Sequence, residues 1–361
     1  MPKIKKNADE AFERLGELFS GGGTDRIYAG MGTRGYHQVK KCENPDAYGE
    51  NRFLELDDGD YAALLERHAA GEKDEIDDDS FPYYYPNEFD EAIYGALVGA
   101  KAVFSVDEHR VSSMVFPFVK DLDEVRHFVM DEGHPWFKAY KKRLEMGAKN
   151  LKGKIGINDV IDITGLNYLV EILGATEAYL ALFDVPEKAK YAMDFSTAQN
   201  IWLREMFFDV VGLQDGGSFV FGHWFPGKVV NESVDAFHLA SAETFERWGR
   251  GPLEKMFSHF DGGALHLHGN GRHLLESVSE VKGLKFITMG DDRPFPPAHE
   301  VVEELAARSK NVPIEVFIPY EAFAKRLAEK TLPGNVFYTV WSVPDSDTGN
   351  RLMGKVKSYR I

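Results

Sequence analysis

The chain has 361 residues, of which 43% are hydrophobic, and its formal net charge is −16. This length and apolar content suffice for one large barrel or for two ordinary domains. The acidic excess excludes a general binder of nucleic-acid backbones, which would need clustered lysine and arginine. The single cysteine, Cys42, excludes an internal disulfide and a zinc site built on several thiolates. No signal peptide or membrane-length apolar run is present, so we expect a cytoplasmic protein with no membrane partner.

The first half of the chain mixes helical patterns with short apolar runs. The glycine-rich turn Met31-Gly32-Thr33-Arg34-Gly35-Tyr36 follows the first strand-like run, and the acidic runs 57–60 and 74–79 are typical of solvated surface. Helices are expected at 9–19, 58–70, 121–130, 135–147, 166–183 and 186–208. Strands are expected at 26–30, 102–107 and 154–163.

The second half alternates more regularly between apolar runs and helical patterns. Such alternation indicates a parallel sheet with right-handed crossovers, and strands that are almost wholly apolar indicate a sheet covered on both faces. Strands are expected at 218–221, 264–268, 284–289, 314–318 and 336–341. Helices are expected at 241–260, 272–281, 297–309 and 320–330.

Eight expected strands with helices between them predict an α/β fold, a single (β/α)₈ TIM barrel. We treat residues 1–361 as one domain, with 1–25 as an N-terminal helical extension. An open doubly wound sheet is the alternative, but no G-x-G-x-x-G fingerprint follows an early strand.

The segment Leu265-His266-Leu267-His268-Gly269-Asn270-Gly271 carries the strongest functional signal. Side chains alternate along a strand, so His266 and His268 are expected to point to the same side. The glycines that follow place both imidazoles at the carboxyl end of the strand, where α/β folds bind ligands. Two neutral imidazoles can chelate a divalent metal, best guessed as zinc, although iron, nickel and cobalt accept similar ligands. The alternative is that one or both only hydrogen-bond inside the barrel.

A complete metal centre needs further ligands from other strand ends. No spacing in the sequence selects among them. The candidates are His223, Glu232, Asp291, Asp292 and Glu315.

Aromatic residues at other strand ends are candidates for substrate binding. The segment 221–227 is expected to be a loop at the same barrel end, with His223 lining the pocket and Trp224 as a stacking wall. The alternative is an aromatic plug that caps the barrel. Tyr36 and Trp341 complete the expected substrate-binding set.

Three residues are candidates for catalytic chemistry. Asp107 or Asp291 could move a proton, and Arg34 could hold a substrate carboxylate. The alternative for the adjacent acids is structural, with one of Asp291 and Asp292 capping the next helix and the other pairing with Arg293.

Four segments follow one another in an order and spacing that match a known family. They are Phe104-Ser105-Val106-Asp107, the strand–Trp–Gly run 219–227, Phe237 with the helical run 241–253, and the strand–Gly–Leu-Leu run 265–276. Over roughly residues 90–345 the chain resembles the uroporphyrinogen decarboxylase superfamily, which includes cobalamin-linked methyltransferases. The resemblance implies a (β/α)₈ barrel with its cleft at the carboxyl ends of the strands.

The resemblance also implies two competing activities. The decarboxylases act on a tetrapyrrole without a metal, through arginines and an aspartate, but only Arg34 stands in the arginine-rich turn here. The methyltransferases hold zinc through a His-x-Cys pair and a later cysteine, and they pass a methyl group to or from a corrinoid. In this chain His266-Leu267-His268 occupies the place of that pair. Tyr338, Thr339 and Trp341 occupy the region of the later cysteine.

We therefore expect a zinc-dependent methyltransferase that acts on a small methylated substrate with a corrinoid protein or a thiol cofactor as its partner. Its metal ligands would be His266 and His268. The alternatives are a metal-free decarboxylase that uses Asp107 and Arg34, and a non-catalytic barrel that binds a small molecule. The assembly we consider is a homodimer.

Overall fold

The computed structural model describes residues 4–33, 58–71, 76–106 and 111–361. Three of the residues singled out above, Arg34, Tyr36 and Asp107, lie outside the described residues, as does Cys42. Their expected roles therefore stay predictions.

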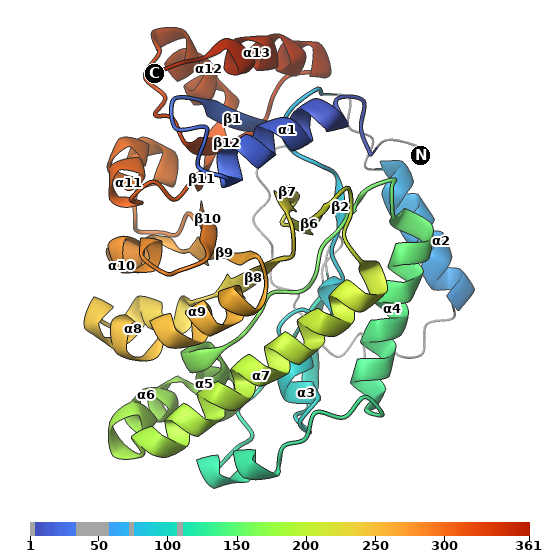
Figure 1. The fold of residues 1–361 in the computed structure, drawn as a ribbon, viewed down its shortest axis with the longest axis vertical. Helices are drawn as coiled ribbons and strands as arrows, with labels where there is room; N and C mark the ends of the chain where they lie inside the picture. Colours follow the sequence, from blue (N-terminus) through green and yellow to red (C-terminus); the bar gives the residue numbers. More distant parts are fainter. Residues whose placement is uncertain (1–3, 34–57, 72–75, 107–110) are drawn as a thin grey trace.

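The centre of the fold is a six-stranded sheet whose paired strands are all parallel (Figure 1). Its strands are largely buried because they carry β-branched and aromatic side chains that helices cover. In sheet order they are β1 (Ile27–Met31), β12 (Val336–Trp341), β11 (Ile314–Pro319), β10 (Leu284–Met289), β9 (Gly262–Leu267) and β8 (Val229–Ser233). Five of these strands were expected from the sequence, whereas β8 was not.

The two edges of this sheet bond to irregular segments. At β1, the amide of Asp79 donates to the carbonyl oxygen of Ala29 over 2.9 Å. At β8, the amide of Asp162 donates to the carbonyl oxygen of Asn231 over 2.7 Å. Between the edges, β2 (Tyr83–Tyr84) pairs with β5 (Gly156–Ile157). The parallel α/β architecture is thus confirmed, but the described residues form no closed eight-stranded barrel, and the expected strand 154–163 is only two residues long.

Two antiparallel pairs lie outside the six-stranded sheet. β3 (Ala102–Val106) pairs with β4 (Val111–Val115), so the expected strand 102–107 is not a strand of the parallel sheet. β6 (Gly217–Val220) pairs with β7 (His223–Pro226), which corrects the expectation of a loop at 221–227. Both antiparallel pairs were missed because a short apolar run does not show whether its partner is parallel or antiparallel.

Helices surround the sheet, and α7 lies beside α4 and α5 (Figure 1). The α-helices are α1 (Ala8–Phe19), α2 (Asp58–Gly71), α3 (Ala92–Ala96), α4 (Pro135–Leu151), α5 (Gly165–Leu173), α6 (Ala175–Asp184), α7 (Pro186–Val211), α8 (Ala242–Trp248), α9 (Arg250–His259), α10 (Leu275–Ser279), α11 (Val302–Arg308), α12 (Tyr320–Glu329) and α13 (Ser346–Ser358). The 3₁₀ helices are η3 (Asn87–Phe89), η4 (Leu122–His127), η5 (Asp235–Leu239), η6 (Gly269–Leu274) and η7 (Ala298–Glu300).

Three expected helices differ from the observed ones. The helix expected at 166–183 is broken at Gly174, whose φ of 86° ends α5 and begins α6. The pattern at 241–260 forms two helices, α8 and α9, and 121–130 contains only η4. Among the described residues no single helix has the length and apolar content needed to cross a membrane; α5 and α6 together have both, but they are bent by 119°.

Helix α1 packs on the β6–β7 hairpin and forms a separate aromatic core. Phe12 lies 4.8 Å from Trp224 between ring centroids, and Phe19 stacks on Phe225 at 3.9 Å. Because β7 leads into the amino end of β8, this core covers the end of the sheet opposite the carboxyl ends of the strands.

Two carboxylates of the acidic run 74–79 are buried, which corrects the expectation of a solvated surface for them. Asp78 and Asp79 are 1% and 0% exposed. Asp78 accepts from Lys5 Nζ over 2.6 Å, and Asp79 accepts from Arg14 Nε over 2.6 Å. These charges are buried because each has an opposite charge and backbone donors from β1 as partners.

Candidate metal centre

His266 and His268 lie together at the carboxyl end of β9. His266 is in the strand, paired with Ser233 of β8 and Thr288 of β10, and His268 is the first residue beyond it. The extended backbone at His268 keeps the strand alternation, so the two ring centroids are 5.2 Å apart. The structure thus brings together the two imidazoles that the sequence singled out.

A third side chain joins them from the neighbouring strand. Asp235 follows β8 by two residues, at the start of η5. Its Oδ1 lies 3.0 Å from Nε2 of His266, and its Oδ2 lies 3.7 Å from Nε2 of His268. The ligand atoms of Asp235, His266 and His268 all lie within 4.8 Å of one another, and no other group of three such residues in the described parts of the chain is this close.

The charges of this cluster are coupled. Burial acts to raise the pKa of Asp235, but the hydrogen bond with His266 and the neighbouring imidazoles lower it to about 2. Burial acts to lower the pKa of His266, but the hydrogen bond and charge of Asp235 raise it overall. The carboxylate of Asp235 thus faces Nε2 of both histidines, which are the atoms that could bind a cation.

Asp292, which follows β10, contacts the other ring nitrogen of His268. Its Oδ2 lies 2.8 Å from Nδ1 of His268 and accepts from the amide of Gly269 over 2.9 Å. The adjacent Asp291 points elsewhere, and its Oδ1 accepts from Arg272 Nη2 over 3.3 Å and from the amide of Ala298 over 2.7 Å. Asp291 therefore accepts from the first residue of η7, as one half of the structural alternative described, whereas Asp292 contacts His268 in place of the expected Arg293. The proton-transfer role of Asp291 stays a prediction.

A further imidazole, His238 of η5, packs behind the cluster. Its ring centroid lies 5.6 Å from that of His268, and its Nδ1 lies 3.7 Å from Oδ1 of Asp235. Burial lowers the pKa of His238 to about 4, so this ring is neutral at neutral pH. A side chain at Gly271 would collide with it, because a Cβ there would be 2.2 Å from its Cδ2.

The donor set fits a divalent cation such as zinc. Two imidazole nitrogens and one carboxylate form a three-ligand set that leaves room for a substrate or water, as in catalytic zinc sites. The carboxylate behind His268 is the kind of partner that metal-bound imidazoles usually have. The Asp235 side chain is 47% exposed and that of His268 is 40% exposed, so an ion and a substrate can reach the cluster from solvent.

Sequence reasoning missed Asp235 and His238. The signal was the run Val229-Val230-Asn231-Glu232-Ser233, a strand that begins just after Gly227 and whose carboxyl end is the start of η5. The polar residues of this run do not fit the apolar pattern by which the other parallel strands were predicted. Once β8 is recognised beside β9, the acid two residues beyond its end becomes the obvious candidate ligand.

The other residues expected at the pocket lie away from the cluster. His223 is 3% exposed, and its Nε2 lies 3.2 Å from Oε1 of Glu315, between Phe286 and Phe337. Trp224 belongs to the aromatic core with α1, where its Nε1 donates to the carbonyl oxygen of Gln214 over 2.9 Å. These placements correct the expectation that His223 and Trp224 share one mouth with the histidine pair. The aromatic packing of Trp224 is like that of the plug alternative, but it lies at the amino ends of the strands.

Three further candidates are at other positions. Glu232 is wholly buried and accepts from the amide of Thr164 over 3.1 Å. Glu315 accepts from the hydroxyls of Thr288 and Thr339 over 2.8 and 2.6 Å. Trp341 is the last residue of β12 and lies at the same carboxyl edge of the sheet as the cluster. This position agrees with a substrate-binding role, which stays a prediction.

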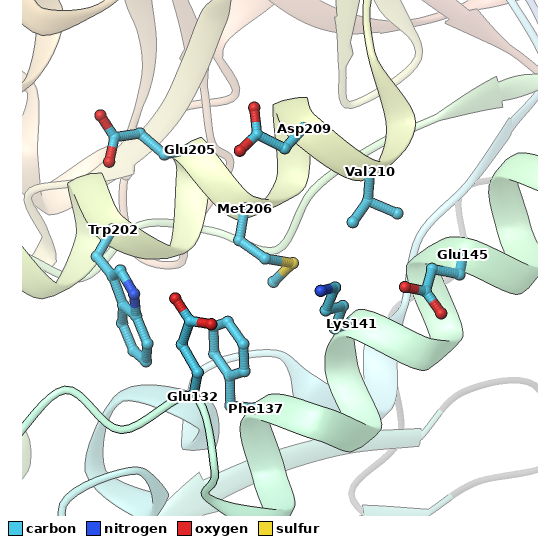
Figure 2. Close-up of a pocket in the computed structure, with 9 residues that line it drawn as sticks. All are labelled: Glu132, Phe137, Lys141, Glu145, Trp202, Glu205, Met206, Asp209 and Val210. Atoms are coloured by element: carbon cyan, nitrogen blue, oxygen red, sulfur yellow. The ribbon is translucent and has the colours of Figure 1, made fainter.

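A cavity of about 590 Å³ lies far from this chemistry, between α4 and α7 on the outside of the fold (Figure 2). Phe137 and Trp202 stack at its base with ring centroids 4.6 Å apart, and Lys141 and Met206 point into it. Four acidic side chains surround it: Glu132, Glu145, Glu205 and Asp209. It contains no imidazole, and we regard it as a surface groove between two helices.

Comparison with known proteins finds similarity in structure but none in sequence. No family model and no curated protein sequence matches the chain. Among solved structures, a methyltransferase from Methanosarcina mazei is similar with a TM-score of 0.59, over 97% of this chain and 98% of that one. The chain shares the fold of that enzyme. At 12% sequence identity the likeness concerns the fold alone.

Proposed function

We propose that this protein is a metal-dependent methyltransferase in which Asp235, His266 and His268 hold zinc or another divalent cation. The observation that carries the proposal is the convergence of these three ligand atoms within 4.8 Å at the carboxyl ends of adjacent parallel strands. Active sites in α/β barrels are built at this end of the strands. The fold shared with a methyltransferase supports the reaction class.

The proposal extends to the methyl carrier. The sequence resembles a superfamily that includes cobalamin-linked methyltransferases, so the methyl group would pass to or from a corrinoid on a separate protein, or to a thiol cofactor. Zinc bound at this centre would supply Lewis-acid activation of a substrate oxygen or sulfur. Asp235 would contribute one negative charge to the bound cation. The side chains of Asp235 and His268 are partly exposed, so a substrate could approach the cation from solvent.

Metal analysis of the purified protein tests the proposal directly. We expect about one zinc per chain in the wild type, and loss of most of it in His266→Ala, because two ligands hold a divalent ion far less tightly than three. The matched control is His259→Ala, which removes an imidazole that is 40% exposed and lies 2.9 Å from Glu205 on the surface. Both variants should keep the wild-type circular dichroism spectrum.

The reaction is then assayed with the metal-loaded protein. Transfer of a methyl group between methylcobalamin and a thiol, absent in His266→Ala and retained in His259→Ala, is the expected result. A wild-type protein that binds no divalent metal would overturn the proposal. Release of carbon dioxide from a tetrapyrrole by metal-free protein would favour the decarboxylase alternative instead.

A further inference from the structure

We infer that Asp292 is the positioning residue of the metal centre: it fixes the tautomer of His268 so that Nε2 carries the lone pair that binds the cation. This inference rests on the proposed function for its biological meaning. The contact itself is a property of the metal-free protein. It gives a role to Asp292, whereas the sequence had made its neighbour Asp291 the catalytic candidate.

The tautomer follows from the two sides of the imidazole. Nδ1 of His268 lies 2.8 Å from Oδ2 of Asp292, which is a hydrogen-bond distance. Nε2 lies 3.7 Å from Oδ2 of Asp235, which is too long for one. A carboxylate only accepts hydrogen bonds, so the neutral ring places its proton on Nδ1 and leaves Nε2 unprotonated.

Asp292 is itself held in place. The same Oδ2 accepts from the amide of Gly269, the residue directly after His268, over 2.9 Å. The carboxylate therefore bridges the backbone and the ring of adjacent residues, and this contact limits rotation of the imidazole. Such partners typically change metal affinity by about 10- to 100-fold when they are removed.

Asp292→Ala is the decisive variant because it removes the acceptor that holds the proton on Nδ1 of His268. Asparagine would not serve, because the single atom Oδ2 meets both Nδ1 of His268 and the amide of Gly269, and an amide oxygen in its place would still accept from both. In Asp292→Ala the nearest carboxylate is that of Asp235, on the other side of the ring. We therefore expect the neutral ring to carry its proton on Nε2, the atom that would bind the metal.

The matched control is Asp291→Ala, one residue away. Asp291 bonds to Arg272 and to the amide of Ala298, whereas Asp292 bonds to His268. Both variants lose one negative charge from the same segment. Only Asp292→Ala removes the hydrogen bond to the imidazole.

Two measurements test the inference. In metal-free protein labelled with ¹⁵N-histidine, at pH 8.5, we expect the Nδ1–H tautomer of His268 in the wild type and Asp291→Ala, and the Nε2–H tautomer in Asp292→Ala. The signal is assigned by its loss in His268→Gln. In competition with a chromophoric chelator, zinc affinity should fall about 10- to 100-fold in Asp292→Ala and stay unchanged in Asp291→Ala.

An unchanged tautomer in Asp292→Ala, or zinc affinity equal to that of the wild type, would overturn the inference. If the wild type itself binds no zinc, the proposed function fails. The tautomer measurement on metal-free protein still decides whether Asp292 orients the ring, so the two failures are distinguishable.

Discussion

At the scale of single residues, the same carboxyl group acquires different properties from its neighbours. Asp235 lies among imidazoles, and these lower its pKa to about 2. Glu171 of α5 has no such partner. Its Oε2 is buried without a hydrogen bond, and burial raises its pKa to about 8, against the hydrogen bond that the amide of Gly95 donates. One acid is therefore ionised throughout the physiological range, whereas the other stays protonated near neutral pH.

Glu171 predicts a pH-dependent cost to stability. The folded state keeps its proton up to about pH 8, whereas the unfolded chain releases it near 4.5, so the free energy of unfolding falls as pH rises between these values. The full effect is about 5 kcal/mol at 1.4 kcal/mol per pKa unit, as an order of magnitude. Glu171→Gln should remove it, so its melting temperature should exceed that of the wild type more at pH 8 than at pH 5.

Glu177→Gln, on the exposed surface of α6, is the control for this measurement. It should shift the melting temperature little and equally at both pH values. A Glu171→Gln difference that does not depend on pH would contradict the buried, protonated state of this side chain.

At the scale of elements, the sequence predicted what depends on local pattern and missed what depends on partners. The strands β9 to β12 were found within two residues at each end, because buried parallel strands are continuous apolar runs. The strand β8 was missed because Asn231, Glu232 and Ser233 interrupt that pattern, although tertiary contacts bury all three. The candidate metal centre was therefore predicted in part: His266 and His268 lie on one strand and its end, whereas Asp235 reaches them only through the pairing of β8 with β9.

The break between α5 and α6 gives a prediction at this scale. Gly174 has a φ of 86°, and a Cβ there would lie 3.3 Å from Cγ of Pro117. Gly174→Ala should lower the free energy of unfolding by about 1–2 kcal/mol, because a side chain disfavours left-handed backbone. Gly354→Ala, inside α13 with open space where its Cβ would lie, should instead raise it by about 0.5–1 kcal/mol. Urea unfolding of both variants measures the difference, and equal shifts of the midpoint would contradict it.

At the scale of the whole molecule, some of the carboxylates that make up the net charge of −16 are buried and connect segments that are distant in the chain. Asp79 bonds to the backbone of β1 through Ala29 and to α1 through Arg14. It thereby joins the amino-terminal helix, the first strand and the segment that borders the sheet. Composition cannot distinguish such a carboxylate from a solvated one, because its burial depends on an arginine 65 residues away in the chain.

Arg14→Met tests how much this junction contributes to the fold. The substitution leaves Asp79 buried without its countercharge, which typically costs about 3–5 kcal/mol. The matched control is Arg26→Met, because the pair of Arg26 with Glu17 is about one-third exposed on both sides and such pairs contribute at most about 1 kcal/mol. The midpoint of urea unfolding should therefore fall much further for Arg14→Met than for Arg26→Met. Adding Asp79→Asn to Arg14→Met should recover part of the lost stability, since no uncompensated charge then remains. Equal midpoints for Arg14→Met and Arg26→Met would contradict the prediction, because they would show that the ion pair of Arg14 with Asp79 contributes no more than an exposed one.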